Sequence, residues 1–369
     1  MKPAGSLAML AAPNRYLPHI CPIFGTKFVA KNAASFRCDK FVAKLITIFA
    51  TITCPLYRYL IWRLDCLTKF LGVDMNVLVC DLGFSSAKWI YGERKGRIIS
   101  AFSYNGENLL VGEDSLMSSG SSYLKTMEEL VRYYPVFVEQ SLKQASCEED
   151  ILLAVGLPYS YWQEQHKPGG AVPALAKSLT GGTIKDVAVF PQGLGGLRDY
   201  LDGLPERPSG NVLGIDIGFN TIIFTLFSPQ KKQIIHGKTL NKRGVHQMAT
   251  SFLLPRIKDL APSGTFTPVE IAFLIEKGYL QYGFERHNVT REIQEAGVAY
   301  IEHIIRDIQG ELQAHVGMHA DFDRVLLFGG GAAFLKNGLP ARNIEVIVLS
   351  EPEYANARGF QTLAFAKGV

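Results

Sequence analysis

Cysteine is scarce beyond the first fifth of this chain, and the cysteines that are present form no known pattern. Four of the six lie among residues 1–74, and only Cys80 and Cys147 follow them. Neither a C-x-x-C pair nor a zinc-binding spacing occurs, so a disulfide framework is not expected. Free thiols in a reducing compartment are the expectation.

No apolar run in the sequence has the length of a membrane-spanning helix. Residues 45–62 are mostly apolar, but Pro55 and Arg58 interrupt them, and the part before Pro55 is far shorter than the roughly 20 residues required. The segment also lies too far along the chain for a standard signal peptide. A cytoplasmic protein is expected, with membrane-surface association only if residues 1–74 are part of it.

An excess of positive charge is also missing from most of the chain. The formal net charge is +4, but residues 1–74 hold ten basic and three acidic side chains, so the remainder is slightly negative. Direct binding to nucleic acid is therefore not expected.

Residues 1–74 differ from the rest of the chain in charge and cysteine content, and Met75 directly precedes the first expected strand. We interpret 1–74 as an over-extended start, with a basic membrane-surface segment as the alternative.

Two short stretches of the sequence are nearly the same. Residues 76–90 read NVLVCDLGFSSAKWI, and residues 211–225 read NVLGIDIGFNTIIFT. Each begins as an apolar strand, reaches an aspartate, and passes through glycine and phenylalanine into two small polar residues. This pattern predicts a tight hairpin in each half of the chain.

Strands and helices alternate after residue 75, twice over, which predicts an α/β fold with two similar halves. Strands are expected over residues 76–83, 88–94, 96–104, 150–158, 186–191, 211–219, 221–228, 232–240, 323–328 and 344–350. Helices are expected from about residue 193 and over 122–145 (with a break or kink at Pro135), 244–257, 290–316 and 353–367. The linker-like composition of residues 202–210 predicts a boundary near residue 205, giving domains 75–205 and 206–352 and a closing helix 353–369.

The duplicated turns have the chemistry of a phosphate and magnesium site. Glycine permits close approach of a ligand, the small polar residues add hydroxyl and amide donors, and Lys88 adds a cation. Asp81 and Asp216, if they face each other across a cleft, would supply oxygens to a hydrated Mg²⁺. A single turn of this kind is common and does not by itself indicate a phosphate site, so the interpretation depends on the duplication.

These motifs, in this order, resemble those of the actin-like ATPase superfamily, and most of all the ParM/StbA-type plasmid-segregation actins and their archaeal relatives. The matching stretches are DLGFSSAK (81–88), VGLP (155–158), FPQGLGG (190–196), DIGFNT (216–221), FGGGA (328–332) and EYANARGF (353–360). The resemblance covers residues 75–369. It implies two duplicated ribonuclease-H-like domains around a nucleotide cleft, with the last helix returning to domain I.

The resemblance also implies roles for single residues. Asp81 and Asp216 would be near Mg²⁺, mainly through water, and Gln192 would orient the attacking water. Phe84 departs from actin, which has a small hydroxyl residue there. The nucleotide-binding residues implied are Gly83, Ser85, Ser86, Lys88, Gly218, Asn220, Thr221, Gly329, Gly330 and Gly331.

The implied function is that of an ATPase that binds ATP with Mg²⁺ and assembles into filaments for plasmid segregation or intracellular positioning. Its expected partners are further copies of itself, with a DNA-binding adaptor as a candidate. Two alternatives stay open: a small-molecule kinase of the same fold, and a scaffold that binds nucleotide without hydrolysing it. The sequence does not distinguish ATP from GTP.

One more pair of residues has the spacing of metal ligands. His315 and His319 lie four residues apart at the end of an expected helix. The sequence offers no third ligand, so a solvated helix face is the expectation.

Overall fold

The computed structural model describes residues 76–118, 120–260, 266–317, 320–332 and 344–367. Residues 1–74 and Met75 lie outside this part of the chain, so the interpretation of the N-terminal segment stays a prediction. Among the described helices, none combines the length and the apolar character needed to cross a membrane.

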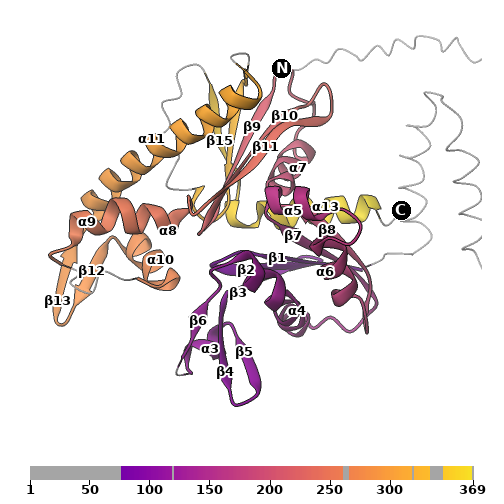
Figure 1. Cartoon of the computed structure of the whole chain (residues 1–369), viewed down its shortest axis with the longest axis horizontal. Helices are drawn as coiled ribbons and strands as arrows, with labels where there is room; N and C mark the ends of the chain where they lie inside the picture. Colours follow the sequence, from indigo (N-terminus) through magenta and orange to yellow (C-terminus); the bar gives the residue numbers. More distant parts are fainter. Residues whose placement is uncertain (1–75, 119, 261–265, 318–319, 333–343, 368–369) are drawn as a thin grey trace, which may run out of the picture. The chain divides into compact units, whose positions relative to one another are not determined.

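The first of two large sheets contains five strands in the order β3-β2-β1-β7-β8 (Figure 1). β1 runs antiparallel to β2 and parallel to β7, and β7 runs parallel to β8. The central strands β1 and β7 are almost entirely apolar, as expected of strands that are covered on both faces. The strands are β1 (Asn76–Leu82), β2 (Ser86–Tyr91), β3 (Arg94–Ile99), β7 (Ile151–Leu157) and β8 (Ile184–Pro191).

The second sheet repeats this arrangement in the order β11-β10-β9-β14-β15. β9 is antiparallel to β10 and parallel to β14, and β14 is parallel to β15. The expected α/β fold with two similar halves is therefore confirmed. The strands are β9 (Val212–Ile217), β10 (Thr221–Ser228), β11 (Gln233–Asn241), β14 (Arg324–Phe328) and β15 (Glu345–Val348).

Long helices cover the sheets and form the main cores. α4 (Met127–Gln144) packs Tyr134 and Phe137 against the first sheet. α11 (Thr290–His315) packs its apolar stripe, including Ile304 and Leu312, against the second sheet. The long helix expected over residues 290–316 is thus present, and its apolar face is buried as the periodicity predicted.

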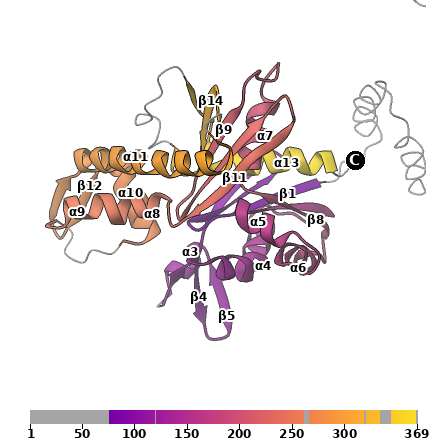
Figure 2. The ribbon, with the colours of Figure 1, turned by 45° about the horizontal axis from the view of Figure 1, so that its top comes forward.

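Two further helices cross each other between the sheets (Figure 2). α7 (Leu194–Asp202) packs Leu197 against Phe328 of the second sheet, although it precedes residue 206 in the chain. α13 (Ala355–Lys367) packs Phe360 against the first sheet. A Cβ atom on Gly359 would lie 1.9 Å from the carbonyl oxygen of Gly195, so glycine at this crossing lets the two helices approach closely.

Of the break or kink expected at Pro135, the break is absent. α4 runs through Pro135 without interruption, and it starts only at Met127 because Thr126 and Glu129 form a capping box there. The hydroxyl group of Tyr134 donates to the carbonyl oxygen of Cys80 at 2.7 Å, which ties the helix to β1 beside the proline. Tertiary packing therefore holds a helix that the local sequence disfavours.

The single strand expected over residues 96–104 is also wrong, because the chain changes sheets at Ser100. β3 ends at Ile99, and β4 (Ala101–Asn105) belongs to a separate sheet of order β5-β4-β6. The helix expected over 244–257 is helical throughout but contains a π-helical part, η1 (Met248–Leu253). The other elements are β5 (Asn108–Val111), α3 (Glu113–Leu116), β6 (Ser122–Tyr123), α5 (Tyr159–Gln165), α6 (Ala171–Leu179), α8 (Val245–Gln247), α9 (Leu254–Ile257), α10 (Pro268–Lys277), β12 (Tyr279–Tyr282), β13 (Glu285–Asn288) and η2 (Pro352–Tyr354).

Candidate functional site

Each half of the chain contains the same tight turn after its central strand. In the first half, the N–H group of Gly83 donates to the carbonyl oxygen of Ser86 at 3.1 Å. In the second half, the N–H group of Gly218 donates to the carbonyl oxygen of Thr221 at 2.9 Å. The duplicated sequence therefore builds a duplicated turn, with an aspartate two residues before the glycine in both.

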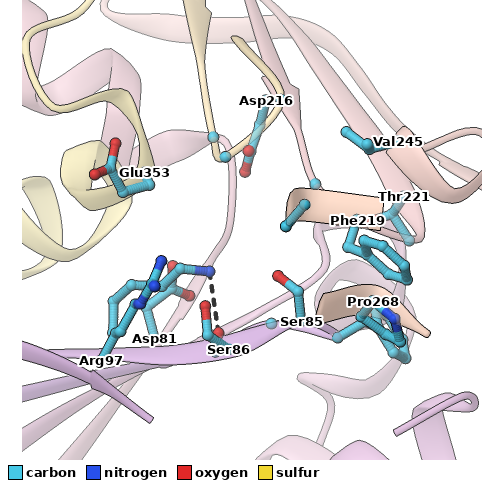
Figure 3. Close-up of a pocket in the computed structure, with 18 of the residues that line it drawn as sticks. Asp81, Ser85, Ser86, Arg97, Asp216, Phe219, Thr221, Val245, Pro268 and Glu353 are labelled. Carbon is cyan, nitrogen blue, oxygen red and sulfur yellow. Dashed lines mark hydrogen bonds between the residues drawn. The ribbon is translucent and has the colours of Figure 1, made fainter. Parts of the chain in front are cut away.

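The two aspartates face one cavity (Figure 3). Asp81 comes from β1 and Asp216 from β9, and the two residues are only 4% and 6% exposed. The cavity has a volume of about 500 Å³. The sequence proposed that these carboxylates face each other across a cleft, and the geometry agrees with that arrangement.

An amide side chain holds each of the two carboxylates. The Nε2 atom of Gln192 donates to Asp81 Oδ1 at 2.7 Å. The Nδ2 atom of Asn356 donates to Asp216 Oδ2 at 2.6 Å. Both amides are buried, so the position of each carboxylate is fixed by a neutral partner.

Asn356 also caps the N-terminus of α7. Its Oδ1 atom accepts from the N–H groups of Gly193 and Gly196, at 3.0 and 3.1 Å. Gln192 makes no side-chain cap at this helix, because the N-cap position is Gly193 and has no side chain. Through Asn356, the carboxylate of Asp216 on the second sheet is connected to the start of α7 and to α13.

Two basic side chains lie opposite each other on the floor of the cavity. Lys88 in β2 pairs in register with Arg97 in β3, and both line the cavity. The Nζ atom of Lys88 donates to the carbonyl oxygen of Ser86 at 3.0 Å. Like charges directly opposite on neighbouring strands destabilise a sheet, so an anion between them would be favourable.

Burial dominates the electrostatics of the site. It raises the pKa of Asp81, and burial followed by the charge of Asp81 raises the pKa of Asp216 to about 7. Burial also lowers the pKa of Lys88, against the attraction of both aspartates. Two carboxylates that share one cavity disfavour each other's ionised form, so added positive charge would stabilise the ionised pair.

Glycine keeps backbone close to both carboxylates. At Gly329 the backbone has a φ of +84°, and a Cβ atom would lie 2.3 Å from Asp216 Oδ1. At Gly156 a Cβ atom would lie 2.5 Å from Asp81 Oδ1. A side chain at either position would displace the aspartate, so the cavity depends on these glycines.

The structure brings together nearly all of the residues that the sequence proposed. Asn220 is the exception: its amide is 3.4 Å from the carbonyl oxygen of Lys125, and it lines a neighbouring cavity instead. The proposed residues that line the main cavity are Asp81, Gly83, Ser85, Ser86, Lys88, Gln192, Asp216, Gly218, Thr221, Gly329, Gly330 and Gly331.

Sequence reasoning missed several residues of the cavity. Asn356 lies within the stretch EYANARGF, but its spacing does not reveal that it reaches Asp216. Arg97 could have been found from the hairpin register, which places it opposite Lys88. Glu276 on α10 and Glu353 also line the cavity, and nothing in the sequence indicated them.

The residues of this cavity fit a phosphate group and a hydrated divalent cation. Carboxylate oxygens are preferred ligands of Mg²⁺, and an ion here would compensate the charges of Asp81 and Asp216. Lys88 and Arg97 could neutralise phosphate oxygens from the other side. Phe84 is buried in the core, so it is a packing residue rather than a donor.

Known structures match this fold, whereas sequence comparison does not identify a family. No family model matches the chain, and no curated protein matches it. The archaeal actin homologue Ta0583 is 17% identical and aligns over 79% of this chain and 100% of its own, with a TM-score of 0.63. A ParM filament from Clostridium botulinum is 17% identical over 80% of this chain and 100% of its own, with a TM-score of 0.55. A ParM of Bacillus thuringiensis with ATP is 13% identical over 80% of this chain and 99% of its own, with a TM-score of 0.55. The chain therefore has the fold of the actin-like ATPases, with ParM and archaeal actin homologues among its structural relatives, as the sequence motifs implied.

Proposed function

We propose that the protein binds ATP with Mg²⁺ between its two aspartate turns, hydrolyses it, and assembles into filaments. The observation that carries this proposal is the pair of matching turns that direct Asp81 and Asp216 into one cavity. The relatives solved with ATP and as a filament support the nucleotide and the assembly, respectively. The cellular role that we propose is plasmid segregation or positioning of another cargo in the cytoplasm, through a DNA-binding adaptor.

The phosphates would bind between the two turns. Lys88 and Arg97 supply positive charge, and Ser85 and Ser86 supply hydroxyl groups on the same side. The turn at Gly218 faces them from the second sheet. Charge-assisted hydrogen bonds of this kind are stronger than neutral ones, which suits a triphosphate.

Asp81, Asp216 and Gln192 would act around the transferred phosphate. The two carboxylates would hold the water ligands of the cation, and bound Mg²⁺ would supply charge that stabilises the phosphate oxygens. Gln192 has an amide that cannot take a proton as a general base. Because it donates to Asp81, we propose that it positions this carboxylate and orients the attacking water beside it.

Self-association would use surface outside the cavity. Three exposed apolar side chains lie on α10 and the β12–β13 hairpin: Val269, Phe273 and Phe284, which are 40%, 47% and 109% exposed. Exposed apolar side chains that gather on one part of a protein favour an interaction surface. We propose that this part of the chain contacts a neighbouring copy in the filament.

The test of the nucleotide site uses isosteric variants. Asp81→Asn and Asp216→Asn keep the size of the side chain but remove its charge, so each is expected to reduce Mg²⁺-dependent phosphate release by about tenfold or more. The double variant is expected to lose less than the sum of the two effects, because both residues act on one ligand. Asp150→Asn is the matched control, since Asp150 forms an exposed ion pair with Lys185.

Binding, phosphate release and sedimentation are measured on the same samples. Wild-type phosphate release in both cavity variants would show that the cavity is not the site of ATP hydrolysis. Phosphate transfer that requires an added small-molecule acceptor would favour a kinase. Tight ATP binding without phosphate release would favour a scaffold.

A further inference from the structure

We propose that His236, Glu311 and His315 form a binding site for a divalent transition-metal ion, zinc, that joins the end of α11 to strand β11. One ligand atom from each residue lies within 4.8 Å of the other two. Glu311 and His315 are four residues apart on α11 and so share a helix face. His236 comes from β11, far away in the sequence.

Only one residue of this cluster, His315, was indicated by the sequence pattern. The pattern offered His315 with His319, and His319 lies outside the described residues. Glu311 from the same helix and His236 from β11 are the additional residues whose potential ligand atoms lie near His315. His315 is half exposed, as expected of a solvated helix face, and the site does not require His319.

Within the described part of the chain, two of the potential ligand atoms lack a hydrogen-bond partner, and one of them, Glu311 Oε2, lies 3.4 Å from His315 Nδ1. The Nε2 atom of His236 and the Oε2 atom of Glu311 are buried and form no hydrogen bond with any residue that the structure describes. Buried polar atoms are nearly always paired, so two such atoms beside each other indicate a ligand between them. The other carboxylate oxygen, Glu311 Oε1, is bonded to Lys238 at 2.5 Å, which leaves Oε2 available as a single ligand.

The rings of His236 and His315 are stacked, with an interplanar angle of 12°, so one ring has to turn before both can bind the same ion. His315 Nδ1 lies 3.0 Å from the backbone carbonyl oxygen of Glu311, and a proton donated there leaves Nε2 with its lone pair. His236 is held between Phe224 and His315, with ring centroids 5.8 and 4.9 Å away. Because the His315 side chain is half exposed, its ring has room to turn toward His236 and Glu311 and to form a Zn–N bond of about 2.0 Å.

The donor set and the location favour zinc. Two imidazoles, one carboxylate and a water molecule give the four-coordinate site that Zn²⁺ prefers. His315 is the last residue of α11, where the negative end of the helix dipole attracts a cation. Ion pairs from Lys238 to Glu311 and from Arg243 to Asp307 already hold the same face of α11, so the metal would add a third connection.

The experiment titrates Zn²⁺ into the full-length, chelator-treated protein in the presence of excess Mg²⁺, which occupies sites that prefer hard ligands. Wild-type protein is expected to bind one equivalent of Zn²⁺ more than each of the variants His236→Gln, Glu311→Gln and His315→Gln. Co²⁺ in place of Zn²⁺ is expected to give the visible absorption of a four-coordinate site, and to lose it in the same variants. His287→Gln, which alters another partly exposed histidine, is the control and should match wild type.

A fourth variant separates metal binding from a purely structural ion pair. Lys238→Met removes the cation beside Glu311, so it should leave the extra equivalent of Zn²⁺ in place with equal or higher affinity. Equal Zn²⁺ stoichiometry in wild type and all three ligand variants would overturn the proposal. Loss of the extra equivalent in Lys238→Met would also overturn it. If His236→Gln fails to fold, the outcome rests on His315→Gln, whose side chain is half exposed.

Discussion

Burial dominates the electrostatic behaviour of Asp81 and Asp216, and a neutral hydrogen-bond partner opposes it at each carboxylate. Each carboxylate accepts from one amide, Gln192 or Asn356, at 2.7 or 2.6 Å. An amide offsets only part of the cost of burying a carboxylate. The free energy of unfolding therefore depends on pH and on any cation that binds at the two carboxylates.

The first prediction concerns the pH dependence of stability. In the nucleotide-free protein with chelator, Asp216 has a pKa of about 7 against a usual value of 3.8, so the folded state keeps a proton that the unfolded state has lost. Its stabilising contribution is complete below about pH 4 and is lost as the pH rises to about 7. Asp216→Asn should remove this loss.

Urea unfolding of wild type and Asp216→Asn between pH 5 and 7 measures the effect. Relative to wild type, the free energy of unfolding of the variant should rise by about 1 kcal/mol per pH unit. The difference between the two free energies of unfolding separates the titration of Asp216 from that of other groups. Parallel pH profiles would show that Asp216 is already ionised in the folded protein.

The second prediction concerns Gln192. Gln192→Ala removes the donor to Asp81 but no basic group, so the affinity for ATP should change by less than about threefold while phosphate release falls about tenfold. Filaments, once formed, should then persist longer. Gln230→Ala is the control, because the Gln230 amide donates to the carbonyl oxygen of Ser209 away from the cavity. Normal phosphate release from folded Gln192→Ala would remove the residue from the mechanism.

The turn residues could be predicted from the sequence because their geometry is local. A glycine two residues after the aspartate closes the same hydrogen bond in both halves, at Gly83 and Gly218. A residue that only tertiary structure brings in, such as Asn356 from α13, could not be predicted in this way. Asn220 shows the opposite error, since its turn is in place but its amide is directed to Lys125.

At the scale of helices and strands, hydrophobic periodicity predicted the long elements and failed where packing overrides local preference. The apolar stripe of α11 is buried as expected. Pro135 predicted a break or kink, but α4 is continuous there, and the adjacent Tyr134 is hydrogen-bonded to β1. Ser100 divides one apparent strand between two sheets, and its Oγ atom donates to the carbonyl oxygen of Gly83 at 2.5 Å.

The third prediction concerns the connection between α7 and α13. Asn356→Ala leaves two N–H groups of α7 and the carboxylate of Asp216 without a partner, so the free energy of unfolding should fall by about 2–3 kcal/mol. Asn220→Ala is the matched control, because its one long hydrogen bond is at a half-exposed position, and it should change stability by less than about 0.5 kcal/mol. Equal stability of the two variants, measured by chemical unfolding, would contradict the role of Asn356.

At the scale of the whole molecule, the duplicated sheets place one aspartate turn on each half of the cavity. Residues 68–369 form a compact unit of their own. Both large sheets and the cavity lie within this unit.

The fourth prediction is that a protein beginning at Met75 folds and binds ATP with the affinity of the full chain. Circular dichroism and titration with ATP and Mg²⁺ test both properties. Because β1 begins at Asn76, a chain that begins after this strand, at Ser86, is the control and should not fold. Loss of nucleotide binding in the protein that begins at Met75 would show that the N-terminal segment contributes to the fold or the site.

The last prediction concerns assembly. Phe284 lies in the two-residue connection between β12 and β13, beside Gly283, and its side chain is fully exposed. A large apolar side chain at a hairpin tip gains free energy only when another surface covers it, and a buried aromatic anchor is a common centre of a protein interface. Phe284→Ser should therefore raise the critical concentration for filament formation by about tenfold, which corresponds to about 1.4 kcal/mol per contact. Binding of ATP should stay unchanged, because Phe284 does not line the cavity. Phe365→Ser, at a half-exposed apolar residue of α13, is the control. Sedimentation at a series of protein concentrations measures the threshold, and an unchanged threshold in Phe284→Ser would place the filament contact elsewhere on the surface.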